Sequence, residues 1–138
     1  MKYLGLDLGT KTLGIAISDR VGVVATGYET IKFEENQYDD LLPEVKDIVS
    51  KEKIDRIVLG FPKNMDNTIG ERAEKTLQFK EKLENHLNME VILEDERWTT
   101  LQANNILIAA DLSRKKRKKV IDKVAATVIL QSYLDRKK

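Results

Sequence analysis

The chain has 138 residues, which suits a single domain over residues 1–138 with a hydrophobic core. Hydrophobic residues make up 41% and charged residues 34% of a chain without cysteine, which excludes a disordered protein, a disulfide framework and a thiolate metal site. The start lacks a signal-peptide pattern, and no apolar run approaches the roughly 18 residues that span a bilayer, so we expect a cytoplasmic protein without membrane contact.

The predicted elements open with three strands and then alternate between helices and strands. Period-two alternation predicts strands over residues 2–8, 13–18 and 21–31, joined by tight turns. A meander followed by alternating helices and strands indicates an α/β fold, with a mixed sheet and helices on both faces. The later elements are a helix around 41–49 with Pro43 in its first turn, a strand over 56–60, a helix over 71–87, a strand over 91–94, a helix from Thr99 or Thr100, and a last helix to about residue 134.

Asp7 is an acidic residue in a strand that is otherwise apolar. Leu4, Leu6 and Leu8 alternate onto one face of this strand. Asp7 therefore takes the other face, where Gly5 leaves room beside it. A carboxylate in such a place is costly unless it is paired, hydrogen-bonded or bound to a metal. A single Asp in a strand is more often a hydrogen-bonded structural residue, so both interpretations stay open for Asp7 alone.

Two further carboxylates come from elements that should reach the same edge of the sheet. Glu96 follows the last predicted strand, and Asp122 lies early in the last helix, on a face that is apolar over the following turns. Together with Asp7 they offer the oxygen ligands that Mg²⁺ and Mn²⁺ favour, and two such ions promote phosphodiester cleavage. The alternatives are an ion pair between Glu96 and Arg97, and a helix-start charge at Asp122.

Other acidic residues and the one histidine are weaker candidates. Asp95 adjoins Glu96 but should face the other way along the strand. His86 lies at the end of a polar helix and is expected at the surface, which argues against a histidine-based nucleophilic mechanism. The remaining weak candidates are Asp19, Asp55 and Asp66.

A run of six basic residues is the strongest charge feature. Residues 111–138 hold ten Lys and Arg against three Asp, a net charge of +7 in a chain whose total is +1. The run is either a solvated loop or a contact for a phosphate backbone, and we favour the second because phosphates relieve the repulsion among adjacent cations. The loop over 61–67 is a further candidate for binding groups, and Trp98 either stacks on a base or packs in the protein. The run consists of Arg114, Lys115, Lys116, Arg117, Lys118 and Lys119.

Four motifs, in order along nearly the whole chain, resemble those of the YqgF (RuvX) family. Four motifs in register are far more specific than any one of them. They are GLDLGTK at 5–11 with GIAISD at 14–19, GFPKNMD at 60–66 with GERA at 70–73, DERWTT at 95–100, and DKVAA at 122–126 with ILQSYLD at 129–135.

The resemblance implies an RNase H-like fold, related to Holliday-junction resolvases, and a bacterial nuclease. The family's acidic triad carries over to Asp7, Glu96 and Asp122 as catalytic residues and as ligands of two Mg²⁺ or Mn²⁺ ions. The implied substrate is the 5′ end of precursor 16S ribosomal RNA, with DNA four-way junctions as the alternative. Implied partners are nucleic acid and a ribosomal subunit, and the protein would be a monomer or a homodimer. We expect the nucleic-acid contacts at Lys11, Lys63, Arg97 and the basic run.

Two other functions compete with a nuclease. A non-catalytic RNA- or ribosome-binding factor would keep the fold and use the carboxylates structurally. The second alternative is a nucleotide-binding ATPase lobe, because the sequence Asp-x-Gly-Thr at the end of the first strand also resembles the phosphate loop of the actin and sugar-kinase fold. That fold encloses its nucleotide between two lobes, and 138 residues supply only one.

Overall fold

A five-stranded mixed sheet organises the protein. The computed structural model describes residues 1–62, 70–95 and 114–136, and of residues 114–123 only the backbone. The strand order is β3-β2-β1-β4-β5. The first three strands form an antiparallel meander, whereas β4 and β5 add in parallel beside β1. The strands are β1 (Tyr3–Leu8), β2 (Thr12–Ser18), β3 (Ala25–Lys32), β4 (Arg56–Phe61) and β5 (Val91–Asp95).

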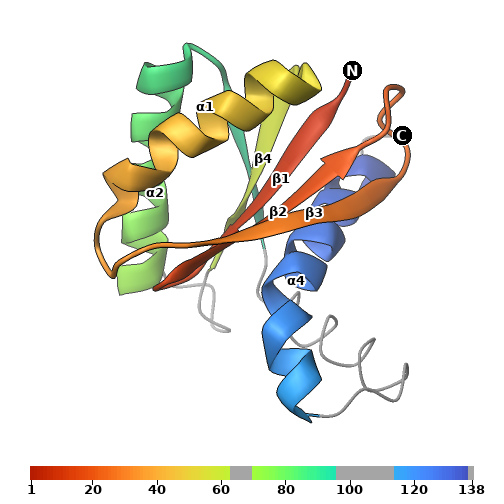
Figure 1. Cartoon of the computed structure of the whole chain (residues 1–138). Helices are drawn as coiled ribbons and strands as arrows, with labels where there is room; N and C mark the ends of the chain where they lie inside the picture. Colours follow the sequence, from red (N-terminus) through yellow and green to blue (C-terminus); the bar gives the residue numbers. More distant parts are fainter. Residues whose placement is uncertain (63–69, 96–113, 137–138) are drawn as a thin grey trace.

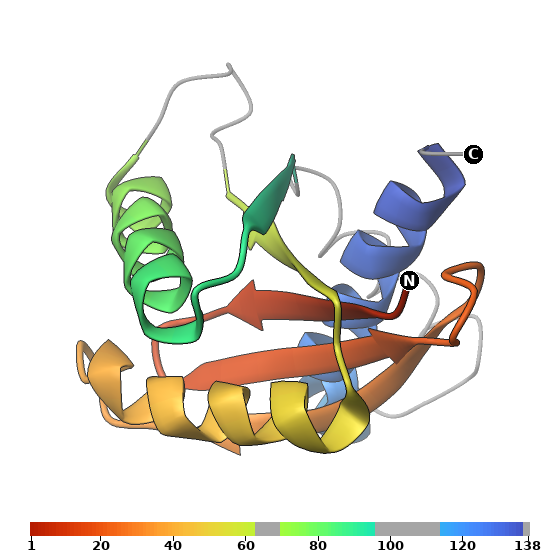
Figure 2. The same cartoon turned by 90° about the horizontal axis from the view of Figure 1, so that it is seen from above.

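Helices cover both faces of the sheet, as predicted. Figures 1 and 2 show α1 and α2 on one side of the strands and α4 on the other. Among the described helices, none combines the length and the apolar character that a membrane-spanning helix requires. The helical elements are a short 3₁₀ helix η1 (Tyr38–Asp40), α1 (Leu41–Glu52), α2 (Glu71–Leu87) and α4 (Arg114–Arg136).

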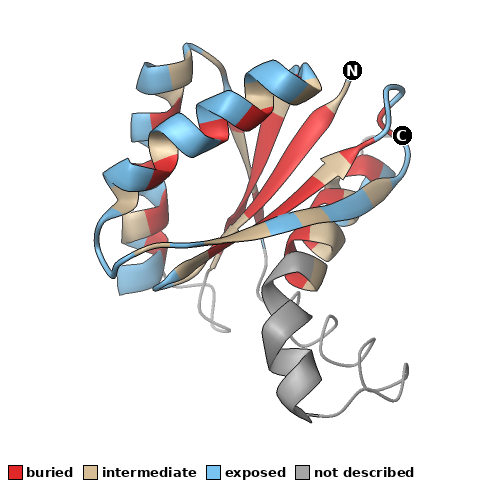
Figure 3. Ribbon diagram, viewed as in Figure 1, coloured by how far each residue is buried: buried red, intermediate tan, exposed pale blue. Residues whose placement is uncertain are grey.

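The alternation in β1 divides the core into two layers. Leu4, Leu6 and Leu8 face α1 and α2, and all three are buried in the larger hydrophobic cluster. Tyr3 faces the opposite side, where a second cluster forms beneath α4 (Figure 3). Each face of the central strand is therefore covered, which is the pattern that the sequence of β1 predicts.

Helix α4 packs directly onto the backbone of β1. A Cβ atom built on Gly5 would lie 2.7 Å from the Cβ of Leu130 and 3.2 Å from the carbonyl oxygen of Ala126. Further along, the ring of Tyr133 lies 5.6 Å from that of Tyr3, measured between centroids. Because Tyr3 precedes Gly5 whereas Tyr133 follows Leu130, α4 runs antiparallel to β1.

Two predicted boundaries are wrong. The strand predicted over 21–31 begins only at Ala25, because Asp19 holds a turn in which its Oδ1 accepts hydrogen bonds from the N–H groups of Val23 and Val24, at 2.7 and 3.1 Å. The last helix begins at Arg114, so the basic run lies within α4 rather than before it. Lys and Arg are good helix formers, so the run can join the helix. The helix expected from Thr99 or Thr100 lies outside the described residues.

Candidate functional site

Asp7 lies near the end of the central strand, on the face that α4 covers. Its neighbour Leu8 points into the opposite core layer, and Asp7 itself is half-buried. The strand therefore places this half-buried carboxylate near the C-terminal end of β1, at one end of the sheet.

The strand positions around Asp7 carry no side chains. In the antiparallel register, Asp7 pairs with Gly14 of β2. In the parallel register, Leu6 pairs with Leu59, so Gly60 of β4 follows beside Asp7. Cross-strand partners share a face, so neither of these two positions places a side chain directly beside the Asp7 carboxylate. We call Asp7 and its flanking Gly14 and Gly60 the glycine bay.

The course of α4 places the backbone of Asp122 toward the C-terminal end of β1, where Asp7 lies. Asp122 precedes Ala126 by four residues, roughly 6 Å along a helix axis. Asp7 follows Gly5 by two residues, roughly 6.6 Å along a strand. Ala126 lies over Gly5, and α4 runs antiparallel to β1. The step from Ala126 back to Asp122 therefore points the same way as the step from Gly5 forward to Asp7. The side chain of Asp122 is not among those described.

Asp122 does not lie at the start of its helix. Because α4 begins at Arg114, Asp122 comes about two turns later. The macrodipole favours carboxylates only within the first turn, so the interpretation of Asp122 as a helix-start charge is wrong. The expected apolar face is confirmed where side chains are described: Ala126 and Ile129 are buried, and Tyr133 is half-buried.

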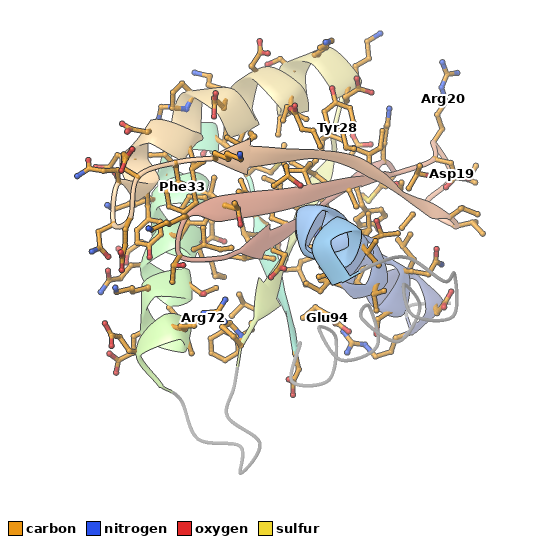
Figure 4. All side chains as sticks on the ribbon, turned by 60° about the horizontal axis from the view of Figure 1, so that its bottom comes forward. Asp19, Arg20, Tyr28, Phe33, Arg72 and Glu94 are labelled. Atoms are coloured by element: carbon orange, nitrogen blue, oxygen red, sulfur yellow. The ribbon has the colours of Figure 1, made fainter. Side chains whose placement is uncertain are left out.

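Strand β5 brings a buried carboxylate to the same face. Glu94 is opposite Gly60 in the parallel register and only 3% exposed. Its Oε2 accepts a hydrogen bond from the Ser132 hydroxyl at 3.2 Å, and its Oε1 pairs with the guanidinium of Arg136 (Figure 4). Glu94 thereby ties β5 to α4. Glu96 follows β5 and lies outside the described residues.

The turn from β1 to β2 places Lys11 at the same end of the sheet as Asp7. The N–H of Gly9 donates to the carbonyl oxygen of Thr12 at 2.8 Å, which closes the turn. The N–H of Phe33 donates to the carbonyl oxygen of Lys11 at 2.9 Å, so the backbone of the turn is fixed while the Lys11 side chain is exposed. The contact of Lys11 with nucleic acid stays a prediction.

Arg72 borders a pocket at the end of β1. Its guanidinium donates to the carbonyl oxygen of Leu8 at 3.1 Å and lines a pocket of about 200 Å³ together with Thr10, Tyr38 and Lys75. Neither Arg72 nor Glu94 is among the predicted site residues. Glu94 could have been found in the same way as Asp7, as a carboxylate within an apolar strand. The one sequence feature that points to Arg72 is its place in the GERA motif at 70–73.

Two of the weaker acidic candidates, Asp19 and Asp55, lie at the opposite end of the sheet from the glycine bay. Asp19 is bound into the turn after β2, at the opposite end of the sheet. Asp55 precedes β4 and accepts the N–H of Lys2 at 2.9 Å. His86 is exposed, as expected, and Asp95 is exposed at the end of β5. Outside the described residues lie Lys63, Asp66, Arg97 and Trp98, and the side chains of the basic run are not described.

No group of three or more metal-ligating side chains forms among the described side chains of 1–62, 70–95 and 124–136. Of the three predicted ligands, only the side chain of Asp7 belongs to these ranges. The acidic triad of Asp7, Glu96 and Asp122 is therefore still a prediction, with one member placed and the backbone of a second described.

Comparisons with known proteins extend over the whole chain. The model of the RuvX family, described as Holliday junction resolvase, matches residues 1–136. A protein of Bacillus subtilis is 56% identical over 135 residues, covering 98% of each chain, and one of a Geobacillus species is 54% identical over 137 residues, covering 99% of each. Both are named, provisionally, as pre-16S rRNA nucleases.

Solved structures confirm the predicted fold. The fowlpox virus resolvase, in complex with Holliday junction DNA, matches with a TM-score of 0.63 at 15% identity, over 99% of this chain and 98% of the resolvase. RuvC of Thermus thermophilus matches with a TM-score of 0.59 at 12% identity, over 99% and 96% of the two chains. The fold is that of the RuvC-like resolvases, and the family match together with more than 50% identity to full-length relatives shows that this chain belongs to the RuvX family.

Proposed function

We propose that this protein is a metal-dependent nuclease that processes the 5′ end of precursor 16S ribosomal RNA. The observation that carries the proposal is the glycine bay: Asp7 lies at the end of the central strand, with Gly14 and Gly60 beside it. A scissile phosphate needs such space next to a carboxylate. The chain is a hydrolase of phosphodiester bonds, since its full-length relatives are named as nucleases.

The residues suit a divalent metal ion. Carboxylate oxygens are the ligands that Mg²⁺ and Mn²⁺ prefer, and Asp7 offers one between Gly14 and Gly60, two cross-strand positions that carry no side chain. We assign Asp7, Glu96 and Asp122 as the holding residues, and the antiparallel course of α4 over Gly5 supports the inclusion of Asp122. When bound, the ions would activate a water molecule and stabilise the leaving oxygen.

Other groups of the chain orient the substrate and the strand. Lys11 is exposed on the turn beside Asp7 and offers a cation to the phosphate backbone. Arg72 holds the carbonyl oxygen of Leu8, so it fixes the end of the strand that carries Asp7. The first turns of α4 carry the basic run, which follows the same helix toward Asp122. Lys63 and Arg97 join this set on the strength of the family resemblance.

Resolution of DNA four-way junctions is the second candidate. It is favoured by the description of the family model and by a fold neighbour solved with junction DNA. The relatives at more than 50% identity are named for ribosomal RNA, and for this reason we place junctions second. Symmetric cleavage of a junction needs two active sites, so this function would require a homodimer on the substrate.

One experiment separates these functions. Purified protein receives, side by side, a precursor 16S RNA with its 5′ extension and a four-way DNA junction, each with Mg²⁺, with Mn²⁺ and with a chelator. The proposal expects metal-dependent cleavage of the RNA at the mature 5′ end and slower or absent cleavage of the junction. Faster symmetric cleavage of the junction would reverse the order of the candidates. Binding of RNA without cleavage under any metal would indicate a non-catalytic factor.

A further inference from the structure

A hollow lined mostly by basic residues lies at the end of the sheet opposite Asp7. It encloses about 520 Å³ and draws its lining from four places: the residue before β1, the turn after β2, the end of α1 and the residue before β4. Figure 4 shows Arg20 far from Arg72, which marks the end of β1. The residues of this basic hollow are Lys2, Arg20, Lys51, Glu52, Lys53 and Asp55.

Both carboxylates of the basic hollow are engaged within the protein. Glu52 accepts from the ammonium of Lys2 at 3.2 Å through Oε1 and from the hydroxyl of Tyr28 at 3.3 Å through Oε2. Asp55 accepts from the N–H of Lys2 at 2.9 Å through Oδ2. The negative groups thus serve to hold β1, α1 and the start of β4 together, and the four cations against two carboxylates leave the basic hollow with a net charge of +2.

Three cations of the basic hollow are directed to solvent. Arg20, Lys51 and Lys53 are exposed, and none of them forms an ion pair with another residue of the described ranges. Like charges that converge on one concave surface repel one another and attract a polyanion. The hollow therefore has the positive charge that attracts a phosphate group.

The helix dipole alone does not account for this gathering of charge. Lys51 lies in the last turn of α1, and Lys53 ends the helix in the left-handed region with φ 54°. Cations are favourable at a helix C-terminus, which explains these two. Arg20 comes from the separate turn after β2, so its presence in the hollow does not follow from the sequence of α1. Lys53 also occupies a position at which glycine is the usual residue, so its side chain is present at a conformational cost.

We propose that the basic hollow binds the phosphate backbone of the nucleic-acid substrate away from the cleaved bond. This inference rests on the proposed function, namely that the chain acts on nucleic acid. The length of β1 separates the hollow from Asp7 by roughly 17 Å, at about 3.3 Å per residue. A duplex strand advances roughly 3.4 Å per nucleotide, so a substrate that reaches both places spans about five nucleotides or more.

This geometry makes a prediction about substrate length. A long RNA contacts both the glycine bay and the basic hollow, whereas a short oligonucleotide contacts the bay alone. The hollow should therefore lower KM for long substrates and leave kcat unchanged. It should also add to the salt dependence of binding, because each phosphate contact releases counterions.

The test neutralises the three exposed cations by Arg20→Gln, Lys51→Gln and Lys53→Gln in one variant. The control variant loses the same charge on the faces of α1 and α2 through Lys46→Gln, Lys80→Gln and Lys82→Gln. Binding of a long precursor RNA and of a short oligonucleotide is measured by fluorescence anisotropy over a range of salt concentrations without divalent metal. Cleavage of both substrates is then measured with metal, and thermal melting verifies that both variants are folded.

We expect the hollow variant to bind the long RNA more weakly, with a salt slope smaller by about 2, since a single-strand contact contributes roughly 0.7. Its KM for the long RNA rises, while its kcat and its affinity for the short oligonucleotide stay at the wild-type level. An unchanged slope, or a loss equal to that of the control, overturns the proposal and points to an acidic protein partner instead. Because binding is measured without metal, the inference can stand even if no variant and no wild-type protein cleaves RNA.

Discussion

Gly5 and Leu130 are in contact at the point where α4 crosses the central strand, and a Cβ at residue 5 would lie 2.7 Å from the Leu130 Cβ. This contact sets the distance between α4 and the backbone of β1. It also fixes the distance between the backbone of Asp122 and the glycine bay, since both elements continue from this crossing. The absence of a side chain at residue 5 is therefore part of the site.

The first prediction concerns this contact. Gly5→Ala should lower the free energy of unfolding by about 1–3 kcal/mol, because the extra methyl group forces α4 away from the sheet. Cleavage should fall more than stability accounts for, since the shift separates Asp122 from Asp7. Chemical denaturation and single-turnover cleavage measure the two effects. Gly27→Ala, on the exposed edge strand β3, is the control. Equal effects of both substitutions would argue against a special role for the crossing.

The second prediction concerns the pairing of Glu94 with Arg136. Arg136→Ala leaves the buried Glu94 carboxylate with the Ser132 hydroxyl as its one partner among the described side chains, and it should destabilise the protein by about 1–2 kcal/mol, a value reduced because the Arg136 side chain is 62% exposed. The double variant Glu94→Leu with Arg136→Ala should recover much of this loss, since no charge is left buried. A double-mutant cycle with urea denaturation measures the coupling. Additive effects would mean that the two side chains do not interact in solution.

The third prediction concerns the basic run at 114–119. Replacing all six residues with Gln keeps a good helix former at each position and should weaken RNA binding. The salt slope should fall by as much as about 4, at roughly 0.7 for each lost contact with a single strand. Anisotropy titrations at several salt concentrations measure this slope. If the slope is retained, the run does not touch the nucleic acid.

The fourth prediction concerns pH and the turn after β2. Hydrogen bonds from the N–H groups of Val23 and Val24 hold the pKa of Asp19 below its ordinary value of 3.8. A lowered folded-state pKa stabilises the turn above pH 3.8, and this contribution is lost as the pH falls through the folded pKa. The amide resonances of Val23 and Val24 should therefore shift with a midpoint below 3.8. Asp19→Asn should abolish this transition, and a midpoint at or above 3.8 would contradict the bonding described.

The parts of the fold that follow from local pattern could be predicted from the sequence. Alternation of Leu4, Leu6 and Leu8 gives the two faces of β1, and helical spacing gives α1 and α2 with nearly correct bounds. The same local logic is misleading at Val21, Val23 and Val24. Their apolar side chains suggest a strand, but they are exposed in the turn that Asp19 closes. A single side-chain cap outweighs β propensity there.

The candidate site could be predicted only in part, because it depends on contacts between distant residues. Asp7 could be predicted as a site residue because it is an acidic residue within an otherwise apolar strand. The partnership of Glu94 with Arg136 joins residues 42 positions apart, and it follows only from the packing of α4 beside β5. The glycine bay likewise depends on the strand register, which brings Gly14 and Gly60 to Asp7 from two different strands.

The most direct test of the central claim is the rate of single-turnover cleavage of precursor 16S RNA by the Asp7→Asn variant in Mn²⁺. The matched control is Asp95→Asn, the same change at an exposed carboxylate that ends β5. We predict that Asp7→Asn slows cleavage by roughly three orders of magnitude, since metal stabilisation contributes several kcal/mol and each 1.4 kcal/mol is tenfold in rate. Asp95→Asn should retain the wild-type rate. Wild-type cleavage by a nuclease-free preparation of Asp7→Asn would contradict the assignment of Asp7 as the catalytic carboxylate.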